Sequence, residues 1–555
     1  MNRAPAWVVA CLALALPLVL PVAVVAASLF APAGEAWRHL VSTVLADYVA
    51  TSLILVAAVL VGVCVIGVAC AWCVTAFEFP ARRFLEWALL LPLAMPAYVM
   101  AYAYTDWLQY SGPLQTALRE ATGWERGDYW FPDIRSVGGA ATMFICVLYP
   151  YVYLLARVAF LEQSPSVSEA GRTLGLTQRQ AFFRLSLPLA RPAIAAGAAL
   201  ALMETLADYG TVAYFGVQTF TTGIFRAWLS MGEPMAAAKL SMILLGFVAL
   251  VIALERVARG RARFHDAQRR SRRGRRRLPR VGAALALAAC VVPLALGFVI
   301  PLVLLLRMSL AGGDAQFGPR FVRLATNSAT LAAIAAAFAV AIALFLAYGA
   351  RLSRNRLVGG VNRLAALGYA VPGAVIAVGI LIPVTRLDNF LADRGLAAGL
   401  VLTGSVGVLV YAYLIRFLGV ALQAIESGLS RVTPHMEDAA RSLGMGAGAT
   451  LARVHAPILR GSLVTAALLV FVDVMKELPA TFVMRPFNFD TLAVQAFNLA
   501  SDERLAEAST ASLAIVAVGL LPVVLASRRL VRSTTETTTT TEHDKAVAIT
   551  GTARP

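Results

Sequence analysis

Four carboxylic acids lie within strongly apolar stretches of this 555-residue sequence. Glu204 and Asp208 are four residues apart, and so are Asp473 and Glu477. A spacing of four places two side chains on the same face of a helix. Carboxylate oxygens suit hard cations, and a charge in apolar surroundings is costly unless it is paired or used. The two pairs are therefore candidates to line a passage for a cation.

The elements that carry these acids are predicted to be membrane helices. Hydrophobic residues make up 59% of the chain and the mean hydropathy is +0.74, whereas ~45–50% apolar residues is usual for soluble domains. About 20 apolar residues in a helix cross a bilayer. The sequence predicts an all-α membrane protein with about 12 transmembrane helices, at about 6–30, 50–75, 85–105, 137–160, 192–217, 236–255, 281–306, 328–350, 364–384, 399–422, 461–483 and 506–527.

In a membrane, ionisable groups mark a substrate or ion pathway by default. The four acids therefore give a translocation-path hypothesis. The alternative is a structural ion-pair network, with Lys476 three residues from Asp473 or an arginine at a membrane end as the partner. No stable metal site is predicted, and both readings stay open.

The distribution of arginine indicates the orientation. The net charge is +17, and twelve arginines fall between Arg256 and Arg280. This segment and the other arginine-rich connections lie on one side if twelve helices follow an amino terminus on that side. By the positive-inside rule this side is cytoplasmic, so both termini are expected there. The linker is expected to face lipid headgroups rather than nucleic acid. The first apolar run is expected to be a retained helix rather than a cleaved signal.

Two polar loops are copies of each other at an offset of 269 residues. The first begins at Ser164 and reads SPSVSEAGRTLGLTQRQAFFRLSLPLARP, and the second begins at Thr433 and reads TPHMEDAARSLGMGAGATLARVHAPILRG. Each half of the chain contains one such loop and six predicted helices. Because six is an even number, the two halves have the same orientation in the membrane and form parallel repeats. We predict a first unit over 1–255 with its loop at about 161–191, a basic cytoplasmic linker over 256–280, a second unit over 281–530 with its loop at about 424–460, and a disordered cytoplasmic tail over 531–555.

Each loop has the signals of a short helix with a defined stop. Ser or Thr precedes Pro at the start, where a hydroxyl can cap free amides and Pro suits the first helical position. Gly175 and Gly444 suit the left-handed residue that ends a helix. Pro188 and Pro457 stand near the start of the next membrane helix. Such an amphipathic helix is suited to a partner's groove.

These loops resemble those of inner-membrane permeases of binding-protein-dependent ABC importers, whose pattern is Glu-Ala-x-x-x-Leu-Gly followed by Leu-Pro. The second copy differs, with Asp438 for Glu and Ala456-Pro457 for Leu-Pro. The resemblance implies the type I importer permease fold, a location in the bacterial cytoplasmic (inner) membrane and a helix that docks on the ATP-binding subunit. The residues that it assigns to this coupling are Glu169, Ala170, Arg172, Leu174, Gly175, Pro188, Asp438, Ala439, Arg441, Leu443, Gly444 and Pro457.

The sequence contains no motif of a P-loop ATPase. A P-loop needs Gly-Lys-Ser/Thr, and none of the three lysines follows a glycine. The longest external loop, at about 106–136, is far smaller than a domain. The chain is therefore predicted to be a non-catalytic subunit without a cofactor. ATP hydrolysis falls to a separate ABC subunit, expected in two copies, and substrate capture to an external binding protein.

Two permease units in one chain look most like the ferric-iron importers, with 473–509 most similar to that branch. Thiamine or another small solute is the alternative substrate. A gradient-driven secondary transporter of the 6+6 type is a further alternative, but the copied loops argue against it, because such a carrier has no motor to dock. A membrane enzyme finds little support, since the five histidines are scattered without a metal-binding spacing.

Overall fold

The computed structural model describes residues 4–32, 34–125, 127–163, 173, 175–259, 276–311, 318–353, 355–395, 401–430 and 432–524. Within these residues eleven helices are long and apolar enough to cross a membrane. A twelfth span results if the bent pair Arg82–Ala94 and Ala97–Thr122, with 91° between its members, counts as one. The prediction of an all-α membrane protein with about 12 membrane helices is confirmed.

The first half of the chain has its helices in the following order. They are α1 (Ala4–Ala27), η1 (Ser28–Phe30), α2 (Glu35–Thr43), α3 (Leu45–Ala76), α4 (Arg82–Ala88), η2 (Leu91–Ala94), α5 (Ala97–Leu108), α6 (Pro113–Thr122), α7 (Val137–Glu162), α9 (Gln178–Ala181), η3 (Phe182–Ser186), α10 (Leu187–Ala207), α11 (Gly210–Tyr214), α12 (Phe220–Phe225), η4 (Arg226–Ser230) and α13 (Pro234–Arg259).

The second half follows with a closely similar series and ends in a membrane helix over Leu505–Val524. Its elements are α14 (Arg280–Leu294), η5 (Ala295–Val299), α15 (Ile300–Ala311), α16 (Pro319–Ser353), α17 (Arg356–Ala366), η6 (Leu367–Ala370), α18 (Gly373–Asp393), α19 (Val406–Leu429), α20 (Pro434–Ser442), α21 (Ala447–Thr450), η7 (Leu451–His455), α22 (Ala456–Met475), α23 (Pro479–Met484) and α24 (Leu492–Ser501).

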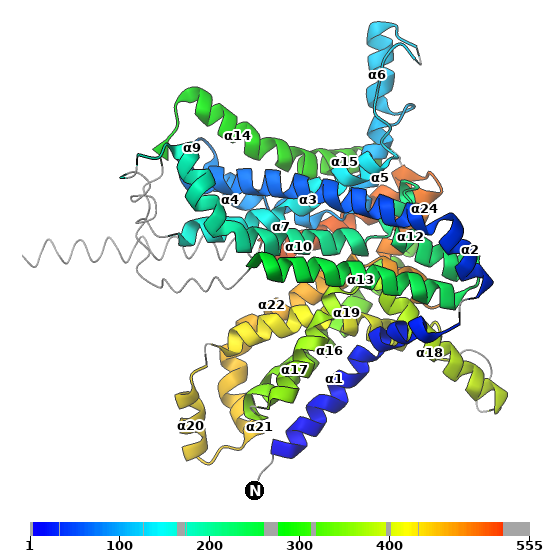
Figure 1. Cartoon of the computed structure of the whole chain (residues 1–555), viewed down its shortest axis with the longest axis vertical. Helices are drawn as coiled ribbons and strands as arrows, with labels where there is room; N and C mark the ends of the chain where they lie inside the picture. Colours follow the sequence, from blue (N-terminus) through cyan, green and yellow to red (C-terminus); the bar gives the residue numbers. More distant parts are fainter. Residues whose placement is uncertain are drawn as a thin grey trace, which may run out of the picture.

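The first membrane helix of each half packs against the other half. Helix α1 packs against α16, α17 and α18 of the second half, and α14 and α15 pack against α3, α4 and α5 of the first. Figure 1 shows α1 within the lower group of helices and α14 along the upper group. The order of apolar runs contains no signal for this exchange, because hydropathy reports burial in lipid and not the identity of the neighbouring helix.

The two groups of helices meet at one end and separate toward the other. Helices α12 and α13 contact α18, and α11 contacts α24. These contacts lie on one side in Figure 1, while α9 and α20, at the opposite ends of their groups, stand far apart. The molecule is therefore closed at the end that carries α12 and α24.

Small residues allow close packing around the centre of the first half. A Cβ at Gly197 of α10 would lie 2.7 Å from the Cα of Val152 on α7, and a Cβ at Gly67 of α3 would lie 2.7 Å from the Cβ of Val152. Backbone approach of this kind replaces hydrophobic driving force between membrane helices. Helix α7 is thus held tightly between α3 and α10.

Two short strands tie the end of the linker to the first half. β1 (Phe77–Glu78) pairs in parallel with β2 (Arg276–Arg277). Residues 260–275 of the predicted linker and the whole predicted tail, 531–555, lie outside the described residues. The division into two units at these boundaries stays a prediction.

Candidate functional site

Two of the four predicted acids lie at matching breaks in two membrane helices. The chain leaves α10 at Ala207 and resumes in α11, and it leaves α22 at Met475 and resumes in α23. Asp208 accepts hydrogen bonds from the amides of Thr211 (2.8 Å) and Val212 (3.4 Å).

Glu477 does the same at the second break. Its carboxylate accepts from the amides of Ala480 (2.9 Å) and Thr481 (2.9 Å), which are the counterparts of Thr211 and Val212 at the offset of 269. The first amides of a helix have no partner within it. Asp208 and Glu477 therefore supply the acceptors that α11 and α23 need.

The second break carries an additional ion pair. Arg416 Nη1 of α19 lies 3.0 Å from Glu477 Oε1, and the Glu477 side chain is only 1% exposed. The position of Arg416 is occupied by Val147 in the first half. Buried charges need a partner, so Glu477 has a more strictly structural position than Asp208.

The other two acids belong to a polar group between the halves, which we name the central cluster: Tyr151, Glu204, Tyr369, Asp473 and Lys476. Tyr369 Oη of η6 donates to Glu204 Oε1 of α10 at 2.8 Å. Lys476 Nζ lies 2.9 Å from Asp473 Oδ1, so the partner named from sequence is present. The charges of Glu204, Asp473 and Lys476 all act on the Tyr151 phenol of α7.

The central cluster is partly open. The side chains of Lys476 and Asp473 are 34% and 17% exposed, unlike that of Glu477. The sequence named Glu204, Asp473 and Lys476 but gave no signal for Tyr151 and Tyr369, because tyrosine is ordinary in membrane helices. Among the described residues, no group of three or more His, Cys, Asp or Glu side chains could hold a metal ion.

Four aromatic rings close the junction of the halves, and we name them the aromatic cluster: Tyr209, Phe225, Phe482 and Phe497. Tyr209 stacks on Phe225 with ring centroids 3.8 Å apart. From the other half, Phe482 and Phe497 lie 5.8 and 5.6 Å from Tyr209. Aromatic pairs with ring centroids roughly 4.5–7 Å apart, as in the two contacts across the halves, attract each other. Tyr209 directly follows Asp208, so this closure is one residue from the helix break.

The second copied loop forms the predicted short helix α20. Its stop is also as predicted, since Gly444 has φ +77°. The predicted hydroxyl cap is wrong: Thr433 occupies the capping position but its side chain makes no cap bond. Met436, Ala439 and Leu443 are spaced i, i+3 and i+7 and form an apolar stripe on this segment, in which Met436 and Leu443 are 43% and 78% exposed. Arg441 pairs with Asp438 at 3.1 Å on the solvent-exposed surface.

The first copied loop is described only in part. Glu169, Ala170, Arg172 and Leu174 lie outside the described residues. Gly175 is exposed and has φ +73°, which matches Gly444. Both loops lead into a π-helical turn, η3 or η7, and then into α10 or α22, each with its proline at the second position. Pro188 and Pro457 thus stand where the sequence placed them.

Helix α16 holds both ends of the second loop. Arg351 donates to the carbonyls of Leu429 (2.7 Å) and Val432 (2.6 Å) and pairs with Glu437 of α20 (2.5 Å). Tyr348 donates to the carbonyl of Ala447 in α21 at 2.9 Å. The position of α20 is therefore fixed to a membrane helix. Arg351 carries no recognisable signal in the sequence, because only folding brings residues 351 and 437 together.

With this geometry in view, comparison with known proteins gives the class of the chain. Residues 63–261 match the family described as "Binding-protein-dependent transport system inner membrane component". Over these residues the chain carries a permease domain of this family. It is a non-catalytic translocation subunit, and such permeases work with a separate ATP-binding subunit and a periplasmic binding protein.

Among individual proteins, the chain is similar over nearly its whole length to the Fe(3+)-transport system permease protein FbpB 2 of Haemophilus influenzae. The two are 24% identical over 493 residues, which is 87% of this chain and 89% of that protein. The probable ABC transporter permease protein y4fN of Sinorhizobium fredii is 25% identical over 82% of each chain.

Shorter relatives match one part of the chain. The sulfate transport system permease protein CysT of Escherichia coli is 28% identical over 34% of this chain and 68% of its own. Among solved structures, a bacterial ABC transporter for alginate import shares 15% identity over 44% of this chain and 94% of the matched chain, with a TM-score of 0.37, which is too low to support an argument.

Proposed function

We propose that this chain is the permease of an ATP-driven importer of ferric iron. The observation that carries the proposal is the similarity to an Fe(3+)-system permease along 87% of the chain. A match of this length includes both copied loops and therefore both permease units. Sulfate permeases match about a third of the chain only. The two-unit architecture therefore favours iron as the substrate.

The copied loops and both termini face the cytoplasm in this proposal. Two copies of the ATP-binding subunit dock on the two loops, one on each. On the second loop, the subunit contacts the exposed apolar stripe of α20. The end with α12 and α24 then faces the binding protein. Since the halves meet at that end and separate at the loops, the conformation is open to the cytoplasm, and nucleotide binding is expected to bring the loops together.

The central cluster is the proposed site on the translocation path where the substrate binds transiently to polar side chains. Glu204 and Asp473 supply carboxylate oxygens from both halves, and hard cations prefer oxygen. Tyr369 and Lys476 occupy these oxygens in the present conformation. A passing cation would exchange with these partners, whereas Asp208 and Glu477 keep their amide bonds and preserve the helix breaks.

Reconstitution tests the proposal. The chain, its ATP-binding subunit and the binding protein are placed in proteoliposomes, and ATP-dependent uptake is measured with ⁵⁵Fe(III), [³⁵S]sulfate and labelled thiamine in parallel. Iron uptake alone supports the proposal. Uptake of sulfate or thiamine without iron would reassign the substrate, and uptake by the chain alone along an ion gradient would place it among secondary transporters.

A further inference from the structure

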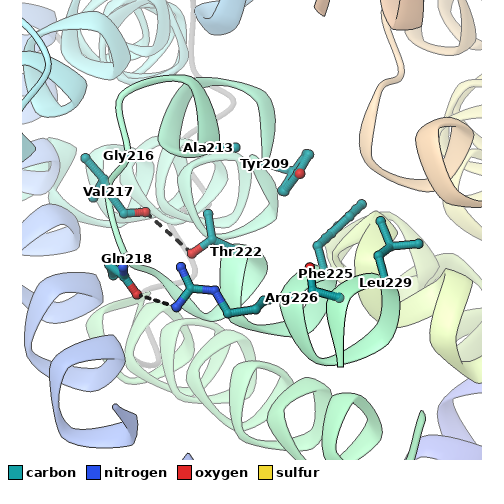
Figure 2. A pocket seen from close by; sticks show the side chains of 10 residues that line it. Tyr209, Ala213, Gly216, Val217, Gln218, Thr222, Phe225, Arg226 and Leu229 are labelled. Carbon is teal, nitrogen blue, oxygen red and sulfur yellow. Dashed lines mark hydrogen bonds between the residues drawn. The ribbon is translucent and has the colours of Figure 1, made fainter. Parts of the chain in front are cut away.

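A cavity of about 240 Å³ lies at the end of the molecule opposite to the copied loops. It is built by one continuous segment, from the break after α10 through α11 and α12 to η4. Figure 2 shows its lining. The residues are Tyr209, Ala213, Gly216, Val217, Gln218, Thr222, Phe225, Arg226, Leu229 and Ser230.

Arg226 is the single charged residue of this lining. Its Nη1 donates to Gln218 Oε1 at 3.2 Å and to Tyr48 Oη at 3.4 Å. None of the ion pairs formed within the described ranges includes Arg226. A guanidinium carries five N–H donors in a planar fork, so most of its donor capacity remains for a ligand.

Two other arginines at this end of the molecule are paired with carboxylates, whereas Arg320 donates to the amide oxygen of Gln495. Arg135 lies 2.6 Å from Glu503, and Arg485 lies 2.7 Å from Asp490. The duplicated half provides a further comparison, since the counterpart of Arg226 is Gln495. The aligned position of the second half therefore carries no charge of its own, and Gln495 accepts a hydrogen bond from Arg320 Nη2 at 3.2 Å.

Two residues of the aromatic cluster form part of the cavity wall. Tyr209 and Phe225 line the cavity, and the same two rings stack on each other and contact Phe482 and Phe497 of the other half. Arg226 follows Phe225 directly in the chain. A ligand in the cavity would touch the rings that close the junction of the halves.

We propose that this cavity is a binding subsite for an oxygen-bearing anion at the outer mouth of the path. Arg226 would pair with the charge, and the amide nitrogen of Gln218 and the hydroxyls of Tyr209 and Ser230 are further donors on the lining. Guanidinium groups bind carboxylates and other oxyanions bidentately. The anion arrives either free or as a ligand of the transported metal. This proposal rests on the orientation given under the proposed function.

Equilibrium binding to the full-length chain in nanodiscs of neutral lipid tests the subsite without ATP or transport. The probes are sulfate, citrate and ferric citrate, measured by isothermal titration calorimetry. We expect saturable binding to the wild type, at least tenfold weaker binding to Arg226→Gln, which installs the residue of the second half, and most of the affinity retained by Arg226→Lys. The control is Arg135→Gln, whose affinity is expected within twofold of the wild type.

The probes separate the two sources of the anion. Equal binding of citrate and ferric citrate identifies a free-anion site, and binding of ferric citrate alone identifies a metal-borne anion; both support the subsite. Wild-type affinity in Arg226→Gln, equal loss in Arg135→Gln, or no saturable binding of any probe to the wild type would overturn it. Iron uptake without anion binding contradicts the subsite only, whereas anion binding without iron uptake contradicts the proposed substrate only.

Discussion

At the scale of single residues, the four intramembrane acids separate into two kinds. Asp208 and Glu477 accept amide hydrogen bonds at the helix breaks, while Glu204 and Asp473 pair with side chains in the central cluster. The spacing of four is the same in both pairs, so sequence alone gives all four the same role. The hydrogen-bond partners in the structure assign different roles to the two kinds of acid.

Glu477→Gln is expected to destabilise the protein by about 3 kcal/mol, because it leaves Arg416 buried without its counter-charge. Asp208→Asn is the matched control, since the counterpart of Arg416 in the first half is Val147. Its cost is expected to be near 1 kcal/mol. Thermal unfolding in detergent measures both, and equal losses in the two variants would show that the Arg416 ion pair contributes nothing.

Glu204→Gln and Asp473→Asn are expected to lower ATP-dependent iron uptake about tenfold, which corresponds to ~1.4 kcal/mol in the transport barrier. Assembly with the ATP-binding subunit is expected to stay intact, because both residues are away from the loops. Glu255→Gln on α13, which removes an ion pair with Arg259, is the control. Wild-type uptake in both cluster variants would leave the central cluster with a structural role alone.

At the scale of elements, α16 and α20 form the connection through which movement of the second loop reaches the membrane. Arg351→Ala is expected to release Glu437 and two carbonyl acceptors. We therefore expect uptake to fall at least fivefold while ATP hydrolysis by the complex continues. Arg363→Gln, at an exposed position on α17, is the control. If transport and hydrolysis stay coupled in Arg351→Ala, α16 does not transmit the movement.

The stop of α20 is the second element-scale test. Gly444 has φ +77°, a conformation that costs a residue with a side chain roughly 1–2 kcal/mol. Gly444→Val is expected to loosen the end of α20 and to weaken binding of the ATP-binding subunit severalfold. Gly448→Ala is the control, because Gly448 is helical and a Cβ there meets nothing within 4 Å. Equal binding by the two variants would contradict the role of this stop.

The elements themselves follow well from the sequence. Apolar runs of membrane length, Gly444 after α20 and the prolines at the starts of α10 and α22 are local signals, and the structure confirms them. Contacts between distant segments are different. The bonds of Arg351 to α20 and of Tyr369 to Glu204, and the exchange of α1 between halves, depend on three-dimensional packing that no local pattern records.

At the scale of the whole molecule, the exchanged first helices join the two halves into one unit. Because α1 packs on the second half and α14 on the first, each half is held from outside by a helix of the other. We expect the halves to change their angle about the end with α12, α18 and α24 without coming apart. The aromatic cluster lies at that end, so opening of the path requires its rings to separate.

The distance between the two copied loops reports directly whether ATP brings them together. Spin labels are placed at exposed positions 179 and 442, and double electron–electron resonance is recorded on the complex with the ATP-binding subunit, with and without ATP. Iron uptake is measured on the same labelled preparation. We expect ATP to shorten this distance and to leave the distance of a labelled pair within one half, 363 and 442, unchanged. An unchanged distance between 179 and 442 in a complex that imports iron would contradict this expectation.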